Sequence, residues 1–131
     1  MTLNKQYNFK SKPEYISKFL SIFNCILPEE NHLTKTELLI FSEFLSLDDS
    51  YDKKRYSSKG INKVYSNLKE RGFIISKQSI YTYIYSLIDK NFIIKQEDNY
   101  KKTNKIIEDL IKKNENNTEI TFKLILDADN S

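Results

Sequence analysis

The chain has 131 residues, of which 30% are charged and 39% hydrophobic, and its formal net charge is +3. This length predicts one compact domain with a single core. No apolar run reaches the roughly 18 to 20 residues that a membrane-spanning helix needs, and the first residues lack the hydrophobic stretch of a signal peptide. We therefore expect no membrane partner and a cytoplasmic location, or a location in a particle assembled in the cytoplasm.

Basic residues are concentrated in the segment 53–77. This segment holds eight basic residues and one acidic residue, Glu70, whereas residues 1–52 carry five bases and eight acids. The usual role of a charge run is a solvated face, but charge of one sign clustered in this way favours a polyanionic partner.

Capping signals and helical spacing predict two helices in the N-terminal part of the chain. Ser11 and Glu14 have the spacing of a capping box, and apolar residues then recur every three or four positions over 12–26. Thr34 and Glu37 repeat the capping box before a second helix. This second helix is expected over 35–47, with Leu38, Leu39, Phe41 and Leu45 facing inward.

Two further helices are predicted within and after the basic segment. The first covers 59–71, and Gly72 follows it at the usual position of a helix-ending glycine. Ser76 is a favourable N-cap for the second, over 77–90. The expected inward residues are Ile61, Val64, Tyr65 and Leu68 in the first, and Ile80, Ile84, Leu87 and Ile88 in the second, with Tyr83 at its edge.

Short strands complete the predicted elements. The polar link before the third helix has room for a strand at 55–57, and "NFIIK" (91–95) is strand-like. "EITFKLIL" (119–126) alternates apolar and polar residues and gives the strongest strand signal in the chain. Between these last two strands, the apolar spacing predicts a short helix over 103–113.

The order of these elements resembles the winged helix-turn-helix family over residues 33–126. The resemblance is carried by "LTKTELLIFSEFL", "INKVYSNL", "SKQSIYTYIYSLIDKNFIIK" and "EITFKLIL". It implies a mainly α fold with a small antiparallel β wing (α+β), preceded by an N-terminal helical extension (1–32) and followed by an acidic tail (127–131). The link "KERGFIIS" and the wing are both longer than is typical of the family, and the wing is expected to contain the helix 103–113.

The resemblance implies double-stranded DNA as the partner of a regulator-like protein, and we expect this protein to be a homodimer formed through its N-terminal helix. In such domains the recognition helix, here 77–90, enters the major groove while neighbouring elements, here the basic segment 53–77, contact phosphates. The base-facing candidates are Lys77, Gln78, Tyr81, Thr82 and Tyr85. The phosphate-contacting candidates are Lys53, Lys54, Arg55, Lys59, Lys63, Lys69 and Arg71.

The tyrosines of the same helix favour a different partner. Tyr81 and Tyr85 would face outward, and only Lys77 is basic in the first two turns of the helix. Tyrosine is enriched at protein interfaces because it supplies a large contact area at low entropy cost. The alternative is therefore a protein that uses the winged helix to dock another protein. The chain also resembles small winged-helix proteins of tailed bacteriophages, and this resemblance implies a structural or assembly component of a virion.

Few residues are candidates for catalysis. Gly60 and Gly72 stand alone, so no glycine-rich loop can cradle a phosphate, and no cysteine and histidine spacing fits zinc. His32 is expected on the solvated surface, and Cys25 as a small buried hydrophobe. We expect no enzymatic activity, no cofactor, no metal and no small-molecule substrate.

Overall fold

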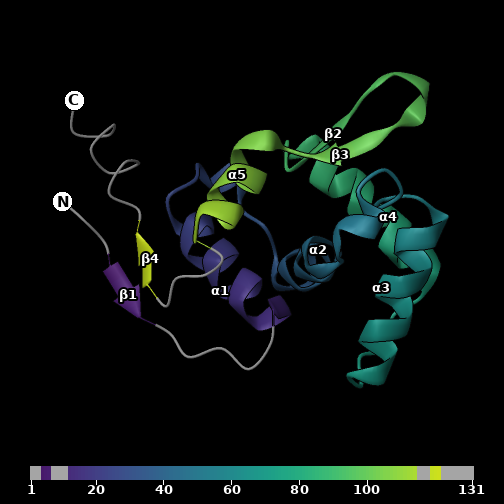
Figure 1. Ribbon diagram of the computed structural model, residues 1–131, viewed down its shortest axis with the longest axis horizontal. Helices are drawn as coiled ribbons and strands as arrows, with labels where there is room; N and C mark the ends of the chain where they lie inside the picture. Colours follow the sequence, from purple (N-terminus) through teal and green to yellow (C-terminus); the bar gives the residue numbers. More distant parts are fainter. Residues whose placement is uncertain (1–3, 7–11, 115–118, 122–131) are drawn as a thin grey trace.

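Five α-helices account for most of the chain that the structure describes (Figure 1). The computed structural model describes residues 4–6, 12–114 and 119–121. The helices are α1 (Lys12–Cys25), α2 (Lys35–Ser46), α3 (Ser58–Glu70), α4 (Lys77–Asp89) and α5 (Lys105–Asn114), with single 3₁₀ turns at Glu29–Asn31, Asp49–Tyr51 and Glu97–Asn99. The described chain is therefore mainly helical with a little antiparallel sheet, which confirms the predicted α+β class.

The β-structure of the described residues forms two separate antiparallel pairs. β2 (Ile93–Lys95) and β3 (Lys101–Thr103) form a hairpin directly after α4. β1 (Asn4–Gln6) pairs with β4 (Glu119–Thr121), which brings segments from the two ends of the described chain side by side.

The second strand of the hairpin after α4 is not the predicted one: it is β3 and not the segment 119–126. The strand predicted over 119–126 contributes β4 to the other sheet, its residues 122–126 lie outside the described residues, and α5 follows the hairpin instead of interrupting it. The physical reason is that a short hairpin loop costs less closure entropy than a connection across a helix. Asp98, with a φ of +59°, supplies the left-handed residue that this loop needs.

The predicted N-terminal caps of α2 and α4 are confirmed. Thr34 Oγ1 accepts a hydrogen bond from the N–H of Glu37 at 3.2 Å, and Glu37 Oε1 accepts one from the N–H of Thr34 at 2.8 Å. Ser76 Oγ accepts a hydrogen bond from the N–H of Ser79 at 3.1 Å. Each contact satisfies a backbone donor that the first turn would otherwise leave without a partner. Ser11 of the other predicted capping box lies outside the described residues.

The helices α3 and α4 end with the same motif. Gly72 and Asn91 have φ values of +88° and +67°, in the left-handed region that glycine and asparagine tolerate best. In each case the N–H of the next residue, Phe73 or Phe92, donates to the carbonyl five residues earlier at 2.9 Å. Gly72 confirms its prediction, whereas Asn91 is a second helix-ending residue inside the predicted strand 91–95.

Residues 55–57, predicted as a strand, form turns. The N–H of Lys54 donates to the carbonyl of Tyr51 at 2.7 Å, and the N–H of Ser57 donates to the carbonyl of Lys54 at 3.1 Å. These bonds run along the chain and not across to another strand, so the strand prediction was wrong. The side chain of Arg55 donates instead to the carbonyls of Phe44 and Leu47 at the end of α2.

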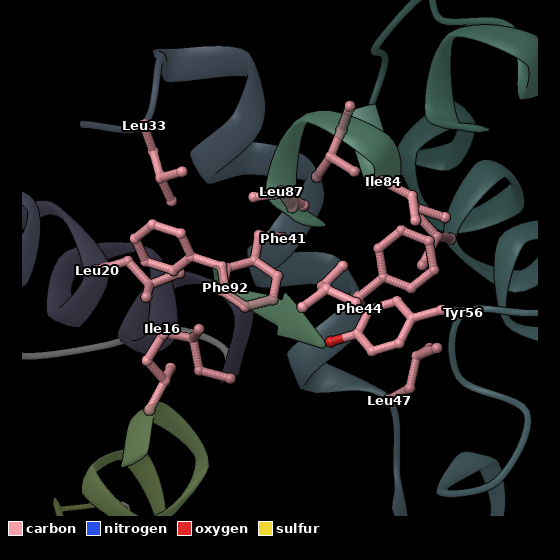
Figure 2. Packing of buried hydrophobic residues seen from close by; sticks show 14 of the residues in the cluster. Ile16, Leu20, Leu33, Phe41, Phe44, Leu47, Tyr56, Ile84, Leu87 and Phe92 are labelled. Atoms are coloured by element: carbon pink, nitrogen blue, oxygen red, sulfur yellow. The ribbon is translucent and has the colours of Figure 1, made fainter. Parts of the chain in front are cut away.

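One cluster of buried apolar side chains joins α1, α2, α3 and α4 (Figure 2). In α2 the predicted Phe41 is buried, but its buried neighbours are Ile40 and Phe44, which were not predicted, while the predicted Leu38, Leu39 and Leu45 are half-buried. α2 contacts α1, α3 and α4, so it buries more than the single stripe that a surface helix shows. Inward predictions confirmed as buried are Ile61, Val64, Leu68, Ile80, Ile84 and Leu87, while Tyr65, Ile88 and Tyr83 are half-buried.

The apolar side of α1 is also part of this cluster. Ile16, Phe19 and Leu20 are each buried. These side chains therefore pack within the chain.

A buried carboxylate fixes α4 against the start of α2. Glu37 is only 2% exposed, and its Oε1 accepts a hydrogen bond from Lys90 Nζ at 2.6 Å. Ser86 Oγ donates to the other oxygen, and Lys90 Nζ also donates to the carbonyl of His32 at 2.8 Å. Burial raises the pKa of Glu37, but the hydrogen bonds from Lys90, Ser86 and the N–H of Thr34 outweigh it and hold the pKa below the ordinary value of 4.5.

Acid is therefore expected to weaken the fold through Glu37. Because its folded-state pKa lies below the unfolded value of 4.5, the carboxylate contributes stability above that pH, and the contribution is lost as the pH falls through the folded-state pKa. Urea unfolding at about pH 6 and about pH 3 measures this loss. The free energy of unfolding should fall more for the wild-type protein than for Glu37→Gln, and an equal fall in both proteins would contradict the assignment.

Candidate nucleic-acid interface

The five base-facing candidates lie on one exposed side of α4. Lys77, Gln78, Tyr81, Thr82 and Tyr85 are all exposed. They share a side because residues three and four apart on a helix are neighbours, and because Ile80, Ile84 and Leu87 hold the opposite side in the core. The structure therefore brings the predicted set together.

Five of the predicted phosphate-contacting residues are exposed lysines of α3 or of the turn before it. α3 packs against α4. None of these lysines forms an ion pair with another described residue, so their charge is available to an external anion. These residues are Lys53, Lys54, Lys59, Lys63 and Lys69.

Tyrosine rings lie beneath several of the ammonium groups. Lys69 Nζ and Lys77 Nζ lie 6.0 and 5.2 Å from the ring centre of Tyr65, so one ring lies close to lysines of α3 and α4. Lys59 Nζ lies 5.1 Å from the ring centre of Tyr51. Such contacts orient the lysines without neutralising them, because the ring carries no net charge.

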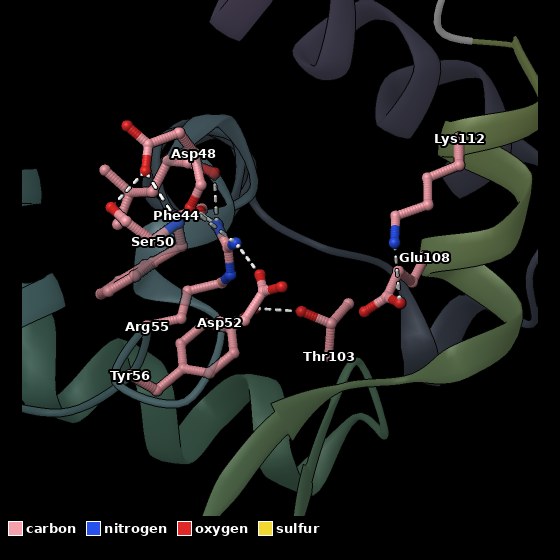
Figure 3. A network of polar contacts seen from close by, with 10 residues as sticks. Phe44, Asp48, Ser50, Asp52, Arg55, Tyr56, Thr103, Glu108 and Lys112 are labelled. Atoms are coloured by element: carbon pink, nitrogen blue, oxygen red, sulfur yellow. Dashed lines mark hydrogen bonds and ion pairs between the residues drawn. The ribbon is translucent and has the colours of Figure 1, made fainter.

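Arg55 differs from these lysines because its guanidinium is used inside the protein (Figure 3). Its side chain is 11% exposed, and Nη1 donates to the carbonyls of Phe44 at 2.6 Å and Leu47 at 2.7 Å. Nη2 donates to Asp52 Oδ1 at 2.8 Å. Arg55 thus adds donors to carbonyls at the C-terminal end of α2, where the carbonyl of Phe44 also accepts from the N–H of Leu47 at 3.3 Å. We therefore leave it out of the phosphate-contacting set.

Arg71 also has an internal partner. Its Nη1 donates to Oε1 of Glu43, a buried carboxylate of α2, and its guanidinium carbon lies 5.3 Å from the ring centre of Phe73. The ion pair compensates the charge of Glu43, which would otherwise be buried alone. Changing Arg71 would therefore alter the fold as well as the surface charge, so it is unsuitable for a test of binding.

Sequence reasoning missed the lysines of the β2–β3 hairpin. Lys95 is exposed, and Lys101 and Lys102 are half-buried. Lys101 Nζ lies 5.9 Å from the ring centre of Tyr85, which brings the hairpin up to the exposed side of α4. Three lysines within eight residues were a detectable signal, but the acids between them concealed it in the charge count.

A buried contact fixes the base of the hairpin to the chain before α3. The hydroxyl of Tyr56 and Oγ1 of Thr103 lie 2.6 Å apart (Figure 3). Burial raises the pKa of Tyr56, so this hydroxyl stays protonated and can donate the hydrogen bond. The turn that carries Lys53 and Lys54 is thus held next to the hairpin.

The groups considered for catalysis are scattered. His32 is half-buried and its Nε2 donates to the carbonyl of Leu27 at 2.7 Å, whereas Cys25 is exposed, so its predicted burial was wrong. A pocket of about 430 Å³ lies between α1, the turn 48–52 and α5. Opposite charges in its wall pair with each other, as Lys112 does with Glu108 at 3.4 Å.

The described residues, 4–6, 12–114 and 119–121, contain no group of three or more histidine, cysteine, aspartate or glutamate residues placed to hold a metal ion. None of their helices has the length and apolar character required to cross a bilayer. No protein-family model matches the chain, and no curated protein or solved structure is significantly similar to it.

Proposed function

We propose that this protein is a non-enzymatic winged helix-turn-helix protein that binds double-stranded DNA. The element order α2, α3, α4, β2 and β3 supports this fold, with the hairpin as the wing. The observation that carries the function is the exposed side of α4, which presents the five candidates beside lysines that have no ionic partner among the described residues. A polyanion complements such a surface.

The chemistry of α4 suits the edges of bases in the major groove. The amide of Gln78 has the donor and acceptor pair that adenine requires, and the ammonium of Lys77 can donate to guanine. The methyl group of Thr82 can contact the methyl group of thymine. Lysines of α3 and of the turn before it then neutralise phosphates on either side, which supplies affinity for any sequence.

The test removes charge from α3 without breaking an ion pair among the described residues. Changing Lys59, Lys63 and Lys69 together to alanine should weaken binding to every duplex by roughly 100-fold at moderate salt, because each lost phosphate contact removes the same electrostatic contribution for any sequence. Fluorescence anisotropy with two unrelated duplexes measures this effect.

The matched control changes Lys105, Lys112 and Lys113 of α5, which Figure 1 shows well away from α3. It removes the same charge and should leave the affinity within about threefold, since surface charges more than a Debye length from the DNA are screened. Equal losses for both triple variants would mean that net charge alone matters, and would contradict the assignment to α3.

A second candidate function is the docking of another protein, as in virion assembly. The observation in its favour is the exposure of Tyr81 and Tyr85, at 43% and 55%. In this case Tyr81→Ala combined with Tyr85→Ala should abolish capture of the partner in a nuclease-treated pull-down. Duplex binding by the wild-type protein at moderate salt would favour the first function over this one.

A further inference from the structure

The turn between α3 and α4 exposes apolar side chains at its tip. Ile74 is fully exposed and Phe73 is 40% exposed, whereas the next residue, Ile75, packs partly against the core. A fully exposed isoleucine next to an exposed phenylalanine is a surface that water solvates poorly. The tip is part of the long link "KERGFIIS". Phosphate contacts by the lysines of α3 and α4 do not require exposed apolar residues in this link.

The turn is held at both ends. On the α3 side, the N–H of Gly72 donates to the carbonyl of Lys69 at 3.0 Å, and the N–H of Phe73 donates to the carbonyl of Leu68 at 2.9 Å. On the α4 side, Ser76 caps the helix. The apolar tip is therefore preorganised, so little conformational entropy is lost when it contacts a partner.

The surroundings of the tip identify the kind of partner. Lys69 and Lys77 lie on either side of it in the chain, and both are exposed without an ionic partner among the described residues. An apolar tip between cations complements a polyanion that also carries apolar surface. Stacked bases between phosphates have this combination, since every base has a hydrophobic π-face.

The tip also lies where a bound duplex would continue beyond α4. It directly precedes the N-terminal turn of α4, at the opposite end of that helix from the β2–β3 hairpin (Figure 1). α4 has 13 residues and a length of about 20 Å. If α4 lies in a groove, the turn between α3 and α4 therefore lies against the base steps next to those that α4 contacts.

We propose that Ile74 inserts between two adjacent base pairs of the bound duplex and unstacks that step, with Phe73 covering the opened edge. Apolar side chains inserted in this way kink DNA, and the energy of unstacking is offset by the additional contact surface. This inference rests on the proposed DNA binding, but it adds a deformation that binding alone does not require.

The experiment uses duplexes with 2-aminopurine next to TA and CA steps, which are the most easily unstacked. The full-length protein should raise the fluorescence of the probe at one step. Ile74→Ala should reduce this rise at least about fivefold and weaken binding on the order of tenfold. The reason is that the alanine variant buries less apolar surface between the base pairs. Ile74→Val should retain most of both effects.

Ile106→Ala is the control, since Ile106 is an equally apolar side chain that is 69% exposed on α5. It should change neither fluorescence nor affinity. Salt-dependent binding of the wild-type protein without any rise in fluorescence would overturn the insertion and leave the proposed function intact, whereas an absence of duplex binding would overturn both. A self-association that Ile74→Ala abolishes, with the fluorescence rise unchanged, would assign the tip to a protein contact and overturn the insertion.

Discussion

Replacing Lys90 with methionine is expected to lower the free energy of unfolding by about 3–5 kcal/mol, because it leaves the buried carboxylate of Glu37 without its counter-charge. Lys90 Nζ is 2.6 Å from Glu37 Oε1 and also donates to the carbonyl of His32. The methionine side chain keeps most of the volume of lysine and removes the ammonium group. Urea unfolding at neutral pH measures the change.

The control for this prediction is Lys105→Met. Lys105 Nζ lies 3.3 Å from Asp109 Oδ1, but both side chains are more than half exposed. An exposed pair of this kind contributes about 0.5 kcal/mol or less. A loss below about 1 kcal/mol for Lys90→Met, similar to that of the control, would mean that Glu37 is stabilised without Lys90.

Replacing Gly60 with alanine is expected to cost about 3 kcal/mol or more, since the new methyl group has no space. A Cβ at this position would lie 1.7 Å from the carbonyl oxygen of Arg55 and 2.9 Å from that of Lys54. Both are backbone atoms, so no side-chain rotation relieves the overlap. The first turn of α3 would have to move away from the turn that carries Lys53 and Lys54.

Thermal unfolding of Gly60→Ala and of Ser66→Ala tests this requirement. Ser66 is exposed on the same helix, and its change to alanine should alter the stability by no more than about 0.5 kcal/mol. If both variants unfold at the temperature of the wild-type protein, the close approach of Gly60 to residues 54–55 is not a feature of the folded protein.

Local signals explain why much of the fold could be predicted from the sequence. The capping box of Thr34 and Glu37, the cap at Ser76 and the glycine at 72 each depend on residues within one helical turn. The exposed side of α4 followed from its periodicity in the same way. Asn91 could have been recognised from its position after the last apolar residue of that helix, because asparagine tolerates the left-handed conformation.

The predictions that failed depend on partners distant in the chain. Arg55 and Arg71 counted as surface charge in the sequence, yet their guanidinium groups bind acceptors of α2 that lie 11 and 28 residues away. Lys90 and Glu37 are 53 residues apart. Strand pairing is similar, because the alternation in 119–121 identifies a strand but not which other strand it will join.

The salt dependence of duplex binding tests the central claim most directly. For the wild-type protein, the logarithm of the affinity should fall linearly with the logarithm of the salt concentration, with a slope of about −0.9 for each phosphate contacted. Changing Lys59, Lys63 and Lys69 to alanine should make this slope less negative by about 2.7, whereas the triple variant of α5 should retain the wild-type slope. An unchanged slope for the α3 variant, or no measurable duplex binding by the wild-type protein at low salt, would contradict the proposal.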